Sequence, residues 1–459
     1  MPINVICHHE LRPEWRRLGL GARPVFLSAD PRKGNVYLAP AKLEASLRAR
    51  LDPLSLDLCE IAAFVYLADK LVPRGRHEKW VRDLSFLIPV RAPARWNEVR
   101  TLLTHTVGTL SGDNVQFRFV EKVGTAAERG AGAGSEPHPG ASDCVSLFSG
   151  GLDSFAGTVH LVQQGRRPLL ASHYVSSLKG LQRELVDGLR NHFDQSFEHF
   201  QYRVTSRRTA TTVYPVKTRE STHRARSFLF MSFAAAAAAV RGLSEIFICE
   251  NGVLSLNVPI SEARKGTRST RHAHPLYLTY FNELIDALYG RQFSVRNPFF
   301  YWTKREEAEL VAAAGLRERI RDTVSCWGYP NLTLKYKDSN HCGTCIPCLV
   351  RRISTIAAGL EDYDDRYAFD AFDADADLAP EQYRNVQDLI YFAESFAGST
   401  KTDLLYRYPE LVMVEVGPDD APSGRLEAMI DVYRRFAEDT VKIAAERAPH
   451  LLRKERQAA

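Results

Sequence analysis

The chain has 459 residues, of which 45% are hydrophobic and 25% charged, and its 60 basic and 55 acidic residues leave a net charge of +5. These values are ordinary for a soluble globular protein and too mildly basic to indicate wholesale nucleic-acid binding. The longest apolar run, Phe228 to Val240, is shorter than the roughly 20 residues of a membrane span, and the N-terminal residues resemble no secretory signal. We therefore expect a cytoplasmic enzyme that spans no membrane.

The first predicted elements belong to a small α/β domain over residues 1–123. Helical spacing predicts a helix over Ser55–Val72 with Ser55 as its cap, and apolar patterning predicts strands over Leu84–Arg91 and Asn114–Lys122. This domain contains no set of residues typical of catalysis. Residues 124–142 are rich in glycine, proline and small residues, which predicts a flexible linker.

After the linker, predicted strands and helices alternate regularly along the chain. The expected strands are Asp143–Phe148, Pro168–Val175, Phe200–Thr205 and Glu245–Glu250, and the expected helices are Phe155–Gln164, Leu178–His192 and Ser221–Arg241. Such alternation predicts a parallel sheet with helices on its faces. We therefore expect a Rossmann-like domain over residues 143–325.

The segment "SGGLDS", Ser149–Ser154, follows the first of these strands. Its two glycines allow backbone N–H groups to surround an anion, its serines add hydroxyl donors, and the next helix directs its positive end to the same place. The segment lacks the lysine of the G-x-x-x-x-G-K-[ST] loop. Asp153, expected in an exposed loop, would orient Mg²⁺ rather than hold phosphate. The six residues alone also fit an ordinary glycine-rich turn capped by Ser154.

Eight cysteines are present, and four of them are clustered. Cys7, Cys59, Cys144 and Cys249 lie in apolar stretches and are interpreted as buried small side chains, whereas the other four, within a module over residues 326–368, are interpreted as a metal site. Four thiolates give Zn²⁺ a closed, structural shell, and an iron–sulfur cluster is the alternative. The ligands would be Cys326, Cys342, Cys345 and Cys348. Residues 369–459 are predicted to form a helical extension.

These motifs resemble those of a known family. "SGGLDS" after a strand resembles the loop of the ATP pyrophosphatases, which cleave ATP between its α and β phosphates. The cysteine pattern, followed by "LVRRISTIAAGLEDYDDRY", resembles the zinc module of the QueC-like 7-cyano-7-deazaguanine synthases. With the added N-terminal domain and C-terminal helices, the chain resembles the QatC component of the Qat antiphage defence system.

The resemblance implies roles for particular residues. ATP would be bound by Ser149, Gly150, Gly151, Leu152, Asp153 and Ser154, with Asp153 and Arg226 catalytic, and the implied cofactors are ATP, Mg²⁺ and Zn²⁺. The family's Pro-Asp-Cys-Arg stretch is replaced here by a basic segment, Pro259–Pro275, which is either a lid over an anionic substrate or a solvated loop. The substrate-binding candidates are Glu250, Asn251, Arg264, Arg268 and Arg271.

By this resemblance, the chain is expected to be an ATP-dependent C–N ligase or synthase. It would adenylate a deazapurine carboxylate similar to 7-carboxy-7-deazaguanine, release AMP and pyrophosphate, and pass the acyl group to an amine in antiphage defence. The alternatives are a housekeeping 7-cyano-7-deazaguanine synthase of queuosine biosynthesis that uses ammonia, and a nucleotide-binding scaffold without turnover. The added domains are expected to dock a protein partner, and direct nucleic-acid binding is not expected.

Overall fold

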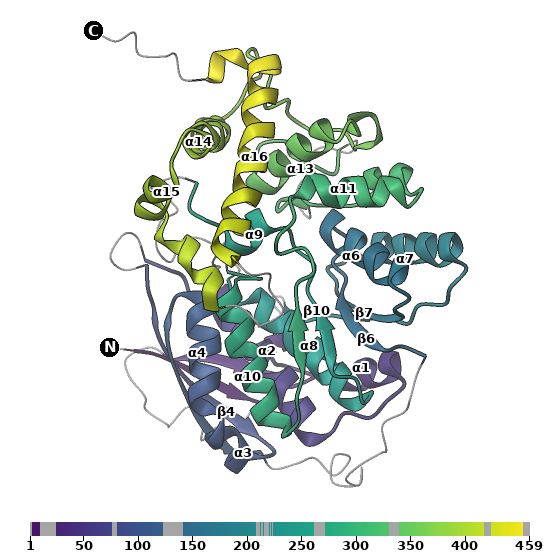
Figure 1. Cartoon of the computed structure of the whole chain (residues 1–459). Helices are drawn as coiled ribbons and strands as arrows, with labels where there is room; N and C mark the ends of the chain where they lie inside the picture. Colours follow the sequence, from purple (N-terminus) through teal and green to yellow (C-terminus); the bar gives the residue numbers. More distant parts are fainter. Residues whose placement is uncertain are drawn as a thin grey trace.

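The computed structural model describes residues 2–9, 24–75, 80–122, 141–207, 212, 214, 220, 222, 224–260, 271–329, 339–416 and 424–452. Two parallel sheets lie side by side at one end of the molecule, and a group of helices occupies the other end (Figure 1). This architecture confirms the predicted α/β class with a helical C-terminal part. No helix among the residues described is both long and apolar enough to cross a bilayer.

The N-terminal sheet has four parallel strands in the order β2-β1-β4-β5. Its strands are β1 (Ile3–His8), β2 (Val25–Ser28), β4 (Asp83–Val90) and β5 (Asn114–Glu121), and its helices are α1 (Pro40–Leu47), α2 (Pro53–Leu71), α3 (Pro93–Glu98) and α4 (Arg100–Ser111). The elements expected over 55–72, 84–91 and 114–122 are all present. Ser55 is not the cap of α2, however, because the chain enters the helix earlier, with Asp52 as N-cap accepting a 2.9 Å hydrogen bond from the Ser55 N–H.

The second sheet has five parallel strands in the order β11-β10-β6-β7-β8. Its strands are β6 (Cys144–Leu147), β7 (Pro168–His173), β8 (His199–Tyr202), β10 (Glu245–Phe247) and β11 (Ser294–Arg296), and the surrounding helices are α6 (Leu152–Gln163), α7 (Lys179–Phe193), α8 (Arg226–Val240), α10 (Pro275–Tyr289) and α11 (Lys304–Ala313). After β6, the chain adds β7 and β8 on one side of β6 and then β10 and β11 on its other side. The carboxyl ends of β6 and β10 therefore flank the point where ligands bind in doubly wound folds.

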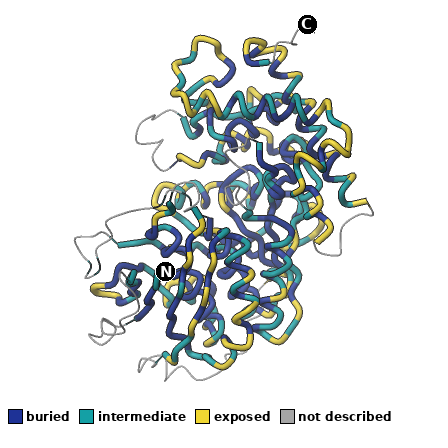
Figure 2. The backbone as a smooth tube through the Cα atoms, turned by 90° about the vertical axis from the view of Figure 1, so that its left-hand side faces the viewer, coloured by how far each residue is buried: buried dark blue, intermediate teal, exposed yellow. Residues whose placement is uncertain are grey.

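The two sheets share one hydrophobic core. Helix α2 lies between them and packs against α8, and buried residues from both sheets form a single apolar cluster, visible as the dark interior in Figure 2. The alanines at positions 234–238 of α8 are fully buried, and small side chains allow the two helices to approach closely. A short antiparallel pair, β3 (Val36–Tyr37) and β9 (Thr205–Ser206), also joins the two parts. The N-terminal domain is thus packed against the second sheet.

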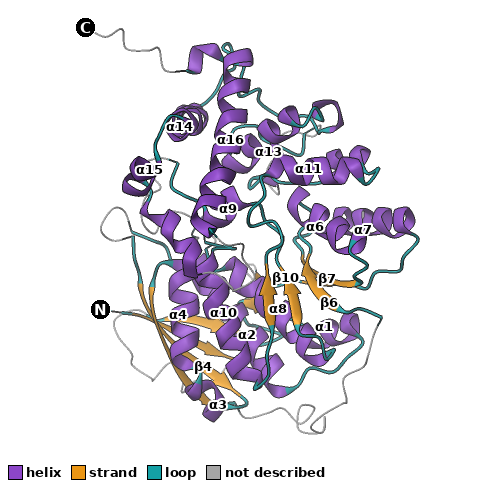
Figure 3. Ribbon diagram, viewed as in Figure 1, coloured by secondary structure: helices purple, strands orange, loops and turns teal. Residues whose placement is uncertain are grey.

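The C-terminal helices form a second core at the other end of the molecule (Figure 3). They comprise α13 (Ile346–Ala357), α14 (Pro380–Ala397), α15 (Lys401–Arg407) and α16 (Arg425–Arg447), with 3₁₀ turns at Pro409–Val416 and Pro449–Leu451. Two further 3₁₀ turns, Arg317–Asp322 and Glu361–Tyr363, pack instead in the cluster around α6, α7 and α11. They pack on α9 (Gly252–Leu256), which follows β10. The buried Tyr433 hydroxyl donates to the Val253 carbonyl at 2.9 Å and accepts from the Val258 N–H at 3.0 Å. The tail therefore fixes the segment that leaves β10.

Candidate active site

The loop Ser149–Ser154 lies at the carboxyl end of β6, as expected from the sequence. Gly150 has a φ of +88°, a conformation that favours glycine, and a Cβ atom there would lie 3.0 Å from Leu181 Cδ2. The Ser149 hydroxyl accepts a hydrogen bond from the Gly151 N–H at 3.2 Å and lies 3.2 Å from the Ser154 hydroxyl. The two serines and two glycines thus form one compact turn at the start of α6.

The start of α6 offers unpaired donors for an anion. Among the residues described, no acceptor lies within hydrogen-bond distance of the N–H groups of Gly150, Leu152 or Asp153. The N–H groups of Leu152 and Asp153 belong to the unsatisfied donors that every helix leaves at its first turn, and they carry the positive end of the helix dipole, whereas the Gly150 N–H lies just before the N-cap Gly151. Ser149 is exposed, so the turn is open to solvent on one side. Backbone donors, hydroxyls and an open side suit the phosphates of a nucleotide.

Asp153 is not in an exposed loop. It is the second residue of α6, its side chain is only 14% exposed, and it forms an ion pair and hydrogen bond with Lys304 of α11. Its other carboxylate oxygen accepts a 2.8 Å hydrogen bond from Asn251 Nδ2. The expectation of exposure was therefore wrong, because α11 returns to the end of β6 and covers the first turn of α6.

The charges around Asp153 determine its ionisation. Burial alone would raise the pKa of Asp153, but the Lys304 ammonium holds that pKa well below its usual range. Glu307, one turn along α11, is fully buried, and burial together with the Asp153 charge raises the pKa of Glu307 well above its ordinary value. Lys304 Nζ lies 3.8 Å from Glu307 Oε2. Asp153 is accordingly the ionised carboxylate of the group, the type of ligand that Mg²⁺ prefers.

Glu250 and Asn251 follow β10, whose carboxyl end lies next to that of β6. Asn251 caps α9 by accepting from the Leu254 N–H, and its side-chain N–H₂ bridges Asp153 and Glu250, lying 2.9 Å from Glu250 Oε1. Glu250 Oε2 lies 2.7 Å from His272 Nε2. These residues, expected to bind substrate, form a hydrogen-bonded series with Asp153 in this structure.

The arginines proposed from the sequence are dispersed. Arg226 begins α8, is exposed, and lies over the Phe230 ring at 5.6 Å, with no contact to Asp153 among the residues described. Arg271 donates to the Thr109 carbonyl of α4 at 3.1 Å. Arg264 and Arg268 lie outside the described residues. Their roles in catalysis or in substrate binding stay predictions.

The four clustered cysteines come together as the sequence predicts. The Sγ atoms of Cys326, Cys342, Cys345 and Cys348 all lie within 4.8 Å of one another, and those of Cys342 and Cys348 are 3.8 Å apart. Zinc–sulfur bonds of about 2.3 Å in a tetrahedron require sulfur atoms about 3.8 Å apart. Gly343 makes this turn possible, because its φ is +86° and a Cβ would lie 2.1 Å from the Phe369 carbonyl oxygen. The cluster is compatible with a closed, structural zinc site.

The cysteine cluster is connected to the phosphate loop. The Val324 N–H, two residues before Cys326, donates to the Gly150 carbonyl at 2.9 Å. The fully buried Arg351 of α13 holds this segment on both sides, since Nη1 donates to the Thr323 carbonyl at 3.1 Å and to the Ser325 hydroxyl at 3.3 Å. The segment that carries the first cysteine therefore lies directly against the loop.

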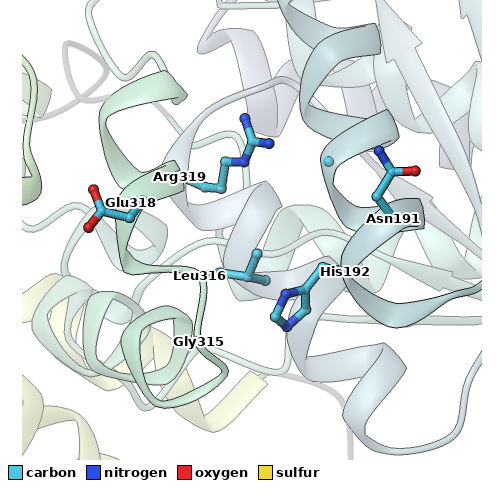
Figure 4. Close-up of a pocket in the computed structure, with 7 residues that line it drawn as sticks. Asn191, His192, Gly315, Leu316, Glu318 and Arg319 are labelled. Carbon is cyan, nitrogen blue, oxygen red and sulfur yellow. The ribbon is translucent and has the colours of Figure 1, made fainter.

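A surface pocket of about 320 Å³ lies elsewhere, between α7 and the turn at Arg317–Asp322. Figure 4 shows Asn191 and His192 on one side of it and Arg319 on the other. None of the residues that line it belongs to the loop, to the Asp153 group or to the cysteine cluster. We therefore do not assign the active site to this pocket.

Two residues of the candidate site were not singled out from the sequence. Lys304 was missed because it lies 151 positions after Asp153, although the Thr303–Glu306 capping box marks the start of its helix. The loop lacks a lysine of its own, and α11 supplies one from a distance. Glu307 was missed because a glutamate in a charged helical stretch such as "KREEAE" is normally solvated. Only the position of α11 against α6 shows that both are buried.

The sheet is doubly wound, and an anion-binding turn and a buried carboxylate–lysine pair lie where the strand order reverses, between β6 and β10. This combination defines a nucleotide-binding α/β domain. Residues 143–359 match the family model described as "Queuosine biosynthesis protein QueC". This region is therefore QueC-like, and the match points to an ATP pyrophosphatase-type ligase. No curated protein matched the chain.

Proposed function

We propose that this protein adenylates a 7-deazaguanine-type carboxylate with ATP and transfers the acyl group to an amine on a partner protein, as part of antiphage defence. The observation that carries the proposal is the QueC-like region with an intact SGGLDS turn, whose Asp153 is paired with a buried lysine. A carboxylate and an amine form only a salt at neutral pH. In adenylation a carboxylate oxygen bonds to the α-phosphorus of ATP and pyrophosphate leaves, so that this oxygen becomes part of a good leaving group, AMP.

The residues of the site suit each part of this reaction. The Ser149–Ser154 turn and the first N–H groups of α6 would hold the pyrophosphate portion of ATP. Asp153 would bind Mg²⁺, which supplies charge neutralisation to the phosphates when it is bound. Lys304 has a flexible side chain, and its ammonium is positioned to stabilise negative charge that develops beside Asp153. AMP and pyrophosphate are the expected products.

The amine acceptor is proposed from the parts of the chain outside residues 143–359. An N-terminal sheet shares the core of the QueC-like region, and C-terminal helices pack on the segment after β10. A ligase that uses only ammonia needs neither addition. The C-terminal helices pack on α9, which follows the carboxyl end of β10, and in this proposal they help to present a protein amine to the acyl-adenylate.

The test is incubation of the purified protein with ATP, Mg²⁺ and 7-carboxy-7-deazaguanine, followed by mass spectrometry of all small molecules and co-purified proteins. The proposal expects AMP, pyrophosphate and a mass increase on a co-purified protein. A free nitrile with an unmodified partner would instead indicate the housekeeping 7-cyano-7-deazaguanine synthase. ATP binding without AMP formation would indicate a scaffold.

A further inference from the structure

His272 has a defined contact in the candidate site that the family match does not explain. Its Nε2 atom lies 2.7 Å from Glu250 Oε2, Glu250 Oε1 accepts from Asn251 at 2.9 Å, and Asn251 donates to Asp153 at 2.8 Å. Through these three contacts the imidazole belongs to the same group as the phosphate loop. The side chains of Glu250 and Asn251 lie between it and Asp153.

The surroundings fix the imidazole while leaving it accessible. The His272 carbonyl accepts a 2.7 Å hydrogen bond from the Ser227 hydroxyl of α8, and the adjacent Arg271 is bound to α4 through Thr109. The side chain is 35% exposed, whereas that of Glu250 is 16% exposed. His272 is therefore held by its backbone and by Glu250, and a second molecule can reach its ring.

The Glu250 contact determines which ring nitrogen can accept a proton. An ionised carboxylate accepts hydrogen bonds and does not donate them, so with Glu250 ionised we assign the hydrogen between the two side chains to Nε2. The other nitrogen, Nδ1, then has a lone pair, and no hydrogen bond to it is found in the part of the chain that the structure describes. An imidazole oriented by a carboxylate in this way is the usual arrangement of a general base.

The proposed reaction needs such a base in its second half. When an amine attacks an acyl-adenylate, a C–N bond forms at the acyl carbon, the C–O bond to the phosphate breaks, and AMP leaves with that electron pair. The attacking nitrogen then carries one proton too many, which a base must accept. Lys304 is paired as a cation with Asp153, and Glu307 is fully buried, so neither is suited to this task.

We propose that His272 is the general base that accepts this proton at Nδ1, with Glu250 as the residue that positions its ring. The inference rests on the proposed adenylation. It concerns only the transfer to the amine, because the first half of the reaction, attack of a carboxylate on ATP, releases no proton from the nucleophile. The two halves can be measured separately, and this separation makes the inference testable.

The experiment compares the full-length protein with His272→Gln. Adenylation is followed as carboxylate-dependent exchange of labelled pyrophosphate into ATP, with 7-carboxy-7-deazaguanine as the probe, and amide formation is followed with ammonium chloride as the amine source. We expect exchange within about twofold of wild type and amide formation lower by about 10²–10⁴-fold, the usual contribution of a general base. His192→Gln, the same change at an exposed histidine of the pocket in Figure 4, should alter neither rate.

A second variant distinguishes a missing base from a disturbed structure. In His272→Gly, the ring is removed at a partly exposed position, so added imidazole should restore part of the amide-forming rate in proportion to its concentration. The inference is overturned if His272→Gln forms amide at the wild-type rate, if exchange and amide formation fall equally, or if imidazole restores nothing. If the wild-type protein shows no exchange at all, the proposed adenylation has failed rather than the role of His272.

Discussion

Replacement of Lys304 by methionine should destabilise the protein strongly, although the substitution is nearly isosteric. The Lys304 side chain is 1% exposed, and its ammonium is the cation nearest to Asp153. Methionine removes the charge and leaves the carboxylate in a largely buried position. The hydrogen bond from Asn251 Nδ2 to this carboxylate remains.

The magnitude follows from the burial of both partners. Removal of one member of a buried ion pair typically costs about 3–5 kcal/mol, because the remaining charge is neither solvated nor paired. The loss of folding free energy caused by Lys304→Met depends on pH. Since Lys304 lowers the pKa of Asp153, the pair stabilises the fold above the ordinary carboxyl pKa of about 4 and loses this effect as the pH falls through the folded-state value. The difference between variant and wild type should therefore be largest near neutral pH and shrink in acid.

The assay is urea unfolding at pH 7 and at about pH 3, below the ordinary carboxyl pKa, with Lys401→Met as the matched control. Lys401 pairs with Glu427 on the surface, where both side chains are largely exposed, so its loss should leave the unfolding midpoint unchanged. The double variant Asp153→Asn, Lys304→Met should recover part of the stability, because it leaves no unpaired charge. The reasoning is refuted if Lys304→Met unfolds at the same midpoint as Lys401→Met, or if the two single effects simply add in the double variant.

Three further predictions concern other parts of the molecule. The four-cysteine cluster should bind one zinc per chain, and chelation should unfold the C-terminal helices by circular dichroism, whereas an iron–sulfur absorption band in the purified protein would contradict the zinc assignment. Gly150→Ala should weaken ATP binding by about tenfold in calorimetry, because a residue with a Cβ atom at a φ of +88° is about 1–2 kcal/mol higher in conformational energy. Unchanged affinity would mean that the turn does not hold ATP. Tyr433→Phe should lower the free energy of unfolding by about 1–3 kcal/mol, because the buried Val258 N–H loses its acceptor and the Val253 carbonyl keeps only the bond from the Asn257 N–H. An unchanged urea midpoint would show that the Tyr433 hydroxyl contributes nothing.

The sequence predicts the local parts of this structure well and the distant contacts poorly. Alternating strands and helices, the SGGLDS turn and the spaced cysteines are all short-range patterns, and each is found where it was expected. The pairing of Asp153 with Lys304 depends on the way α11 returns to the sheet, which no short-range pattern describes. The same limit applies to α2. Its helical spacing was visible, but its burial between two sheets, which joins the N-terminal part to the rest, depends on the tertiary fold.

The hydrogen bond from the Val324 N–H to the Gly150 carbonyl couples the cysteine cluster to the phosphate-binding loop, although the two sites bind chemically unrelated ligands. The position of Val324 depends on Cys326, and the conformation of Gly150 determines where the phosphate-binding donors point. If the ordering of one site favours the other, thermodynamic linkage requires the effect to be reciprocal. Metal at the cysteines would then tighten ATP binding, and ATP would raise the affinity for the metal by the same coupling free energy. Removal of the metal would then weaken ATP binding as well as unfold the C-terminal helices.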